Sequence, residues 1–251
     1  MPVYTQDLMV EAMANGVEDM LIDGLSFKLQ PGASYVVDRR SVTYHPQGSN
    51  IYTPGAGTRL IRILLTGEDW MDPSTLRIMF NIRNNGNNLQ YLRLLGGPWC
   101  FFRRMRILAA GQLVEDIDQY NRIHEMMHIL IASESRDNDA AEAIGDVWND
   151  HKWQSGLVGA PNWRGVPPQD YMTVLFKPLS GILNQNKLIP LRFAPLTIKL
   201  ELVDTFTEPI ISNFVNLGGF NGINSSQLWQ IEQVQCKVDV CTLDNALHNL
   251  R

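Results

Sequence analysis

LTIKLELVD, residues 196–204, alternates apolar and charged side chains with a period of two. In an extended chain Ile198, Leu200 and Leu202 share one face, and the lysine and glutamate between them share the other. The pattern predicts a strand with one buried face and one face toward water.

Similar short segments recur along the chain, separated by glycine, proline and asparagine. Most are rich in the β-branched and aromatic residues that favour strands. They span residues 35–45, 58–67, 76–83, 89–95, 101–116, 171–177, 188–194, 196–204 and 229–240. Strands and helices do not alternate as they would in a parallel sheet. The sequence therefore predicts an all-β sandwich or barrel of about eight to ten strands.

Two connections carry turn signals. Asn85-Gly86 is a pair that tight hairpins prefer, so we expect 76–83 and 89–95 to form a hairpin. A second hairpin is expected within 101–116, with its turn near Gly111.

The last predicted strand, WQIEQVQCKVDV (229–240), changes parity partway along. Its apolar residues occupy odd positions up to Ile231 and even positions from Val234 on, which predicts a β-bulge. The same alternation directs Cys236 inward and Cys241 outward, so these two thiols are poorly placed to share a metal.

The strands are interrupted at 117–170 by a predicted helix and a long acidic loop. Asp118 is a candidate N-cap for a helix that runs to about Ser133. We expect the apolar residues at helical spacing to form its buried face. They are Tyr120, Ile123, Met127, Leu130 and Ile131.

This helix contains His124-Glu125-Met126-Met127-His128, which fits the H-E-x-x-H pattern of zinc peptidases. In those enzymes the two imidazoles bind the metal and the glutamate activates water. No third histidine follows at the expected spacing, and Glu142, the other candidate ligand, lies in a polar segment. We therefore expect His124 and His128 to flank the apolar stripe and make ordinary hydrogen bonds. A zinc metallopeptidase that uses His124, Glu125 and His128 is the alternative.

Other polar clusters suggest no active site. Asp137 and Asp139 lack the residues that would continue a calcium-binding loop. Arg103, Arg104 and Arg106 stand beside aromatic residues, and we expect them to pair with nearby acids rather than bind RNA. The sequence therefore predicts no enzyme, no cofactor and no bound metal.

Composition limits the function classes further. The net charge of −5 argues against direct nucleic-acid binding, because such proteins usually carry a basic patch. Three cysteines do not make a disulfide framework and suit a reducing compartment. No signal-peptide pattern and no membrane-length apolar stretch is visible. We expect a soluble protein that is intracellular when made.

Four segments resemble the major capsid proteins of polinton-like viruses and virophages. GTRLIRILLTGEDWMDPSTLRIMFNIRNN (57–85) is similar to an early strand pair of that family, and FFRRMRILAAGQLVEDIDQYNRIHEMMHIL (101–130) to its strand–turn–strand and following helix. KPLSGILNQNKLIPLRFAPLTIKLELVD (177–204) resembles its SG-x-L segment and the paired strand after it, and VDVCTLDNAL (238–247) the end of its first barrel.

The resemblance implies a double jelly-roll family, in which each chain has two eight-stranded barrels and three chains form one capsomer of an icosahedral shell. It implies that this chain assembles with copies of itself and other capsid subunits, as a homo-trimer in the full-length family. It also implies a location in the virion capsid, after synthesis and assembly inside the host cell, and a structural helix at 118–133.

The 251 residues leave room for one such barrel. We expect an N-terminal arm at 1–24, one eight-stranded jelly-roll at 25–247 with its insertion at 117–170, and at 248–251 the chain end or the start of a linker to a second barrel. The chain would then be a first-barrel fragment or a single-barrel relative.

Trp148, Trp153 and Trp163 in the long loop are candidate subunit-interface residues, because tryptophan is enriched in interface cores. Packing of these tryptophans on their own barrel is equally open. A carbohydrate-binding jelly-roll is a further alternative, because fold does not fix function.

Overall fold

The computed structural model divides the chain into two units, residues 1–35 and 36–251. It describes residues 36–54, 59–86, 90–94, 96–132, 134–135, 166, 168–204, 210–216 and 219–243. The predicted arm at 1–24 and the three loop tryptophans Trp148, Trp153 and Trp163 lie outside these residues, as do Asp137, Asp139 and Glu142.

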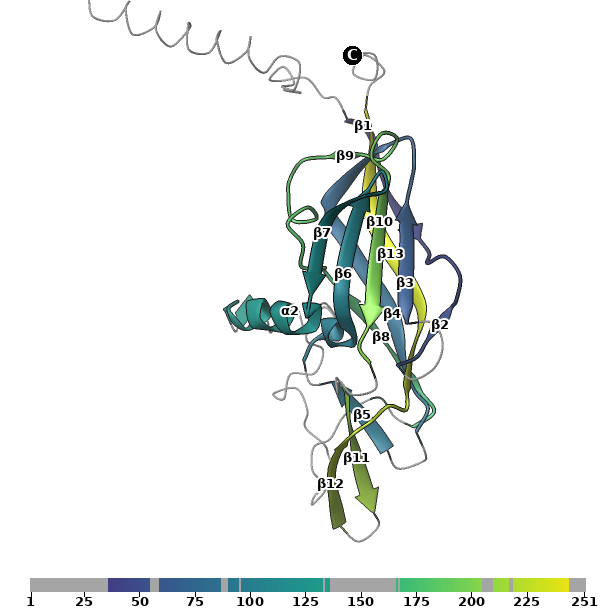
Figure 1. Cartoon of the computed structure of the whole chain (residues 1–251), viewed down its shortest axis with the longest axis vertical. Helices are drawn as coiled ribbons and strands as arrows, with labels where there is room; N and C mark the ends of the chain where they lie inside the picture. Colours follow the sequence, from purple (N-terminus) through teal and green to yellow (C-terminus); the bar gives the residue numbers. More distant parts are fainter. Residues whose placement is uncertain are drawn as a thin grey trace, which may run out of the picture. The chain divides into compact units, whose positions relative to one another are not determined.

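Three antiparallel sheets contain the described strands (Figure 1). The largest has the order β1 (Val36–Tyr44), β13 (Trp229–Leu243), β4 (Trp70–Asn84) and β8 (Tyr171–Phe176), with β2 (Ile51–Tyr52) on β13 and β9 (Ile189–Pro190) on β4. The second has the order β3 (Leu60–Leu65), β10 (Leu196–Leu202), β6 (Phe102–Ala109) and β7 (Gln112–Asp118). The smallest joins β12 (Gly219–Ser225), β11 (Ile210–Asn216) and β5 (Gln90–Leu94).

The strand order of the two larger sheets is that of a jelly-roll. Its eight main strands, in chain order, are β1, β3, β4, β6, β7, β8, β10 and β13. The first, eighth, third and sixth of these form one sheet, and the second, seventh, fourth and fifth form the other. Consecutive strands thus cross repeatedly between the sheets, as in the paired Greek keys of a jelly-roll. The predicted fold class is confirmed.

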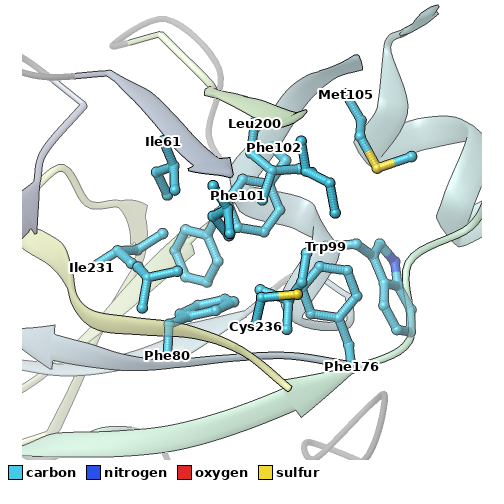
Figure 2. Close-up of a cluster of buried hydrophobic side chains, with 14 of the residues drawn as sticks. Ile61, Phe80, Trp99, Phe101, Phe102, Met105, Phe176, Leu200, Ile231 and Cys236 are labelled. Carbon is cyan, nitrogen blue, oxygen red and sulfur yellow. The ribbon is translucent and has the colours of Figure 1, made fainter. Parts of the chain in front are cut away.

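The core lies between these two sheets (Figure 2). Phe80 of β4 makes edge-to-face contacts with Phe101, Phe102 and Phe176, with ring centroids 5.6–6.2 Å apart. The alternation in 196–204 contributes as predicted, because Ile198, Leu200 and Leu202 are fully buried. The inward side chains of the two sheets thus pack against each other and form the core.

One of the two predicted hairpins is present. β6 and β7 turn through Ala110 and Gly111, whose φ angles of 47° and 84° suit a tight turn between twisted strands. The hairpin predicted at Asn85-Gly86 is wrong, because β5 pairs with β11 instead of β4. β13 and β8 occupy the two edges of β4, so no edge remains for β5.

The β-bulge predicted in 229–240 is confirmed. Gln233 has a φ of 54°, and the register with β4 shifts between Glu232 and Gln235. Cys236 points into the core as predicted. Cys241 was expected outward, yet it is only 2% exposed, in a strand that has β1 on one side and β4 on the other.

One other expectation needs correction. In the segment 188–194 only Ile189–Pro190 is a strand, because the chain then turns and the N–H groups of Phe193 and Ala194 donate to the Pro190 carbonyl. Among the described residues, no helix has the length and apolar character needed to cross a membrane.

Candidate functional site: the histidine cluster of α2

The helix with the H-E-x-x-H pattern, α2, spans Tyr120–Ile129. Asp118 is not its N-cap, because it is the last residue of β7 and pairs in register with Arg104. Gln119, with a left-handed φ of 51°, turns the chain from strand to helix. The helix ends four residues before the predicted Ser133.

The buried face of α2 is shifted around the helix from the predicted stripe toward the two histidines. Tyr120, His124 and His128, spaced four residues apart, are buried. Of the predicted apolar stripe only Tyr120 is buried, while Met127, Leu130 and Ile131 are exposed. The reason is that α2 packs on β6 and on the 3-10 helix η1 (Pro98–Phe101), where an aromatic surface suits imidazole rings.

Trp99 of η1 supplies that surface. Its indole, 2% exposed, stacks on His124 with ring centroids 4.0 Å apart and an angle of 19° between the planes. The His128 ring lies 4.7 Å from the same indole at a tilt of 56°. The two imidazoles that would bind a metal in a zinc peptidase therefore pack on one tryptophan.

Glu125 also helps to hold α2 against Trp99. Its Oε2 accepts a hydrogen bond from the indole Nε1 of Trp99 at 2.7 Å and a longer one from the backbone N–H of Gly97 at 3.4 Å. A Cβ atom on Gly96 would lie 2.6 Å from this oxygen, so the glycine admits the carboxylate. The arrangement gives Glu125 a structural partner at the position where a peptidase needs a free general base.

The same helix fixes the segment that follows β8. The Tyr120 hydroxyl accepts from the Leu179 N–H at 2.9 Å, and His124 Nε2 lies 3.2 Å from the Lys177 carbonyl oxygen. On β7, Glu115 accepts from the hydroxyl of Ser180 and from the N–H of Gly181. Residues 177–181, which include the start of the SG-x-L segment, are thus held by side chains from β7 and α2.

The electrostatics of His124 agree with a packing role. Burial is the main cause that lowers its pKa to about 4, so the ring is neutral at pH 7. A neutral ring that bonds a carbonyl through Nε2 carries its proton there, which leaves Nδ1 as the atom with a lone pair. Nδ1 is buried and has no hydrogen-bond partner within the described part of the chain.

No cluster of three or more metal-ligating side chains occurs among the residues that the structure describes. The candidate third ligand Glu142 lies outside them. His124, Glu125 and His128 instead come together around Trp99. This role of Trp99 was not predicted from the sequence. The adjacent Gly96-Gly97-Pro98-Trp99 was the available signal, since paired glycines beside a tryptophan mark a close approach.

The arginines of β6 pair with acids, as predicted. Arg104 donates to Asp116 from two nitrogens, at 2.7 Å from Nε, and this bond lowers the pKa of Asp116. Arg103 and Arg106 each lie 4.0 Å from an acid, Asp118 and Glu201 respectively. These pairs cross between neighbouring strands and support the sheet only modestly, because they face solvent.

We expect Glu125→Ala to destabilise the fold by about 2 kcal/mol, because it removes the acceptor of the buried Trp99 indole N–H. Urea unfolding measures the loss. Glu134→Ala is the matched control, because Glu134 is exposed beyond the helix and should change stability by less than about 0.5 kcal/mol. Equal stability of the two variants would contradict the structural role of Glu125.

We also expect weak acid to destabilise the protein through His124. Between pH 6.5 and 4 the unfolded chain binds a proton that the folded chain does not, so stability falls as the pH falls through this window. The loss between pH 7.5 and pH 5 is about 2 kcal/mol. Urea unfolding at both pH values measures it. The variant His124→Phe keeps an aromatic ring on Trp99 and should lose less stability between pH 7.5 and pH 5. A loss as large as that of the original chain would contradict the assignment to His124.

No protein-family model matches the sequence, and no curated protein matches it. Solved structures do match. The cryo-EM structure of the Sputnik virophage matches with a TM-score of 0.50 and 9% identity, over 88% of this chain and 51% of that chain. The crystal structure of PBCV-1 VP54, fitted into a cryo-EM reconstruction of Sputnik, matches with a TM-score of 0.49 and 13% identity, over 88% of this chain and 46% of that chain.

The mavirus major capsid protein matches with a TM-score of 0.45 and 9% identity, over 90% of this chain and 50% of that chain. This chain spans about half the length of these proteins. The strand order and the likeness to the Sputnik structure agree, and they confirm the expected resemblance at the level of the fold. The chain is a jelly-roll, folded like part of the Sputnik virophage structure.

Proposed function

We propose that this chain is a structural subunit of a viral capsid, corresponding to one jelly-roll of a double jelly-roll major capsid protein. The observation that carries the proposal is the likeness in fold to the Sputnik virophage structure, over 88% of the chain. Jelly-rolls occur in capsids, lectins and other proteins, so the likeness alone supports the fold and the function needs further argument.

The placement of the long connections supports a shell role. They follow β4, β7 and β10, which run in the same direction, and so they leave the barrel at one end (Figure 1). β5 from the first pairs with β11 from the last, and Leu92 of β5 bridges Val166 from the second. A barrel whose long connections pair with one another at one end can pack side by side with other barrels while that end stays accessible.

The chemistry of α2 supports a structural role as well. The carboxylate of Glu125 accepts a hydrogen bond from the indole of Trp99, and the imidazoles of His124 and His128 pack on the same indole. These contacts do not favour a zinc peptidase. Carbohydrate binding remains a prediction that a glycan array can test.

We infer that the partners are copies of this chain and other capsid subunits, with a homo-trimer in the full-length protein, inside a virion capsid assembled in the host cell. Trp148, Trp153 and Trp163 are the proposed interface tryptophans. No nucleic acid and no cofactor is part of this function, and no catalytic residue is assigned.

Mass photometry and negative-stain microscopy of the purified chain test the proposal. We expect discrete oligomers that grow with protein concentration, because a shell subunit must recognise its own copies. A strictly monomeric species at all concentrations and salt conditions would count against a self-assembling subunit.

A further inference from the structure

The outward surface of α2 and its C-terminal residues is almost entirely apolar. Five large side chains here are between 42% and 77% exposed. We call this surface the α2 apolar end; it consists of Met126, Met127, Ile129, Leu130 and Ile131. A helix on the surface of an isolated subunit normally turns its polar side to water, so this orientation is reversed.

The reversal follows from the contacts already described. His124 and His128 occupy the inner side of the helix against Trp99, so the methionines and aliphatic residues must face away from the barrel. Figure 1 shows α2 beside β7, extending away from the sheet. Within α2, Arg122 is the exposed charged side chain, while Glu125 is partly buried and bonded to Trp99.

The size of this surface is that of an interface. At about half exposure each, five such side chains offer on the order of 500 Å² of apolar area, near the upper range for a patch on a monomer. A standard specific interface takes roughly 800 Å² from each partner. The α2 apolar end can therefore supply most of one side of a stable contact, with a polar rim from neighbouring residues.

The surrounding charges are compatible with a copy of the same surface. The acids of β7 nearest to α2 are already paired: Glu115 with Ser180 and Gly181, Asp116 with Arg104, and Asp118 with Arg103. Two copies brought together here would therefore not be driven apart by unpaired carboxylates of β7. The surface also has no excess charge that would select an acidic or basic partner.

The neighbouring sheet edge points to side-chain contact rather than to added strand pairing. β7 pairs with β6 alone among the described strands, and its register shifts between Ile107 and Leu108, so that Val114 is an extra residue. Such bulges, together with the acids on this strand, discourage another strand from pairing at an edge. The helix end is then the available contact surface on this side.

We propose that the α2 apolar end is a subunit interface and that its occupant is a second copy of this chain. The choice of a second copy rests on the proposed capsid function. The place of contact rests on the exposed side chains, the paired charges and the bulged strand edge.

A charge placed on this surface tests the inference. Leu130, the most exposed of the five residues, is changed in Leu130→Glu, and Leu228→Glu is the control at an exposed leucine in another part of the chain. Circular dichroism verifies that both variants fold. We expect Leu130→Glu to raise the protein concentration for half-association at least tenfold and Leu228→Glu to leave it within twofold.

Three results are possible, and each is decisive. The expected difference supports the interface. If both variants associate like the original chain, the interface is wrong while the shell function stands. If the original chain does not associate at all, the shell function fails and the interface fails with it.

A cross-linking experiment identifies the occupant directly. The cysteines Cys100, Cys236 and Cys241 are buried, so Met127→Cys introduces a single exposed thiol that takes a photoreactive maleimide. A mixture of nitrogen-14 and nitrogen-15 copies then separates cross-links between copies from cross-links within one copy. Mixed-isotope products support the proposal. Products within one chain alone, or to an added lipid vesicle, would overturn it.

Discussion

Gly97→Ala is expected to destabilise the protein by about 3 kcal/mol or more, in spite of the small size of the change. Gly97 has φ −75° and ψ 179°, which alanine adopts without strain, so the backbone is not the cause. The cause is space. A Cβ atom on Gly97 would overlap Cζ2 and Cη2 of the Trp99 indole and lie 2.6 Å from its Cε2.

The indole cannot move aside at low cost. It is stacked on His124, in contact with His128, and hydrogen-bonded to Glu125. A shift of the ring would therefore disturb the contacts of Trp99 with all three of these α2 side chains. Thermal unfolding should show a fall of roughly 6–12 °C in melting temperature for a chain of this size.

Gly67→Ala is the matched control for this prediction. A Cβ atom at Gly67 would have its nearest neighbours at 3.8 Å, an ordinary contact, and the φ angle there is not positive. We expect a change below about 0.5 kcal/mol. If Gly97→Ala were as stable as this control, the packing of Trp99 between η1 and α2 would be wrong.

Phe80→Ala is the second large prediction, with an expected loss of about 4 kcal/mol. Phe80 is fully buried, and its ring contacts the rings of Phe101, Phe102 and Phe176 (Figure 2). These partners come from η1, β6 and β8, so the deletion would leave a cavity where both sheets and η1 meet. Phe176 and Phe102 also stack on each other, which limits how far they can move to fill it.

Phe193→Ala is the control, because it removes the same side chain where it is 61% exposed. We expect it to cost less than about 1 kcal/mol. Denaturant unfolding of both variants gives the comparison. A Phe80→Ala loss as small as that of Phe193→Ala would mean that Phe80 does not lie at the centre of the core.

The strands were predictable because their signals are local. Alternation in 196–204, the turn at Gly111 and the parity change before Cys236 each depend on a few neighbouring residues, and each is present in the structure. The pairing of Arg103 and Arg104 also follows from local sequence, because Asp116 and Asp118 lie on the next strand of the same hairpin, whereas Arg106 pairs with the distant Glu201.

The errors arose where a distant part of the chain decides the outcome. Asn85-Gly86 has a hairpin sequence, but β13 and β8, from far along the chain, already occupy both edges of β4. Residues 120–131 have an apolar stripe, but Trp99 selects the adjoining side of the helix, where His124 and His128 lie. Cys241 has the outward parity, but it lies in a central strand between two partners from distant parts of the chain and is buried.

The H-E-x-x-H pattern shows the same limit for the site. Its spacing correctly predicts that His124 and His128 share a face of a helix. What that face meets depends on η1, which precedes the helix by about 20 residues and carries the indole. Spacing alone could not distinguish a metal from a tryptophan as the group between two imidazoles.

The central claim is that the first and last main strands lie side by side and close the jelly-roll. Arg39 of β1 is directly opposite the native Cys241 of β13, whereas Arg40 is opposite Val240. Mild oxidation of the Arg39→Cys variant should therefore give an intramolecular disulfide to Cys241, identified by mass spectrometry of the linked peptides, and the Arg40→Cys variant should not form it. A failure of the Arg39→Cys variant to form this bond, or an equal yield in both variants, would contradict the β1–β13 pairing on which the fold and the proposed capsid role depend.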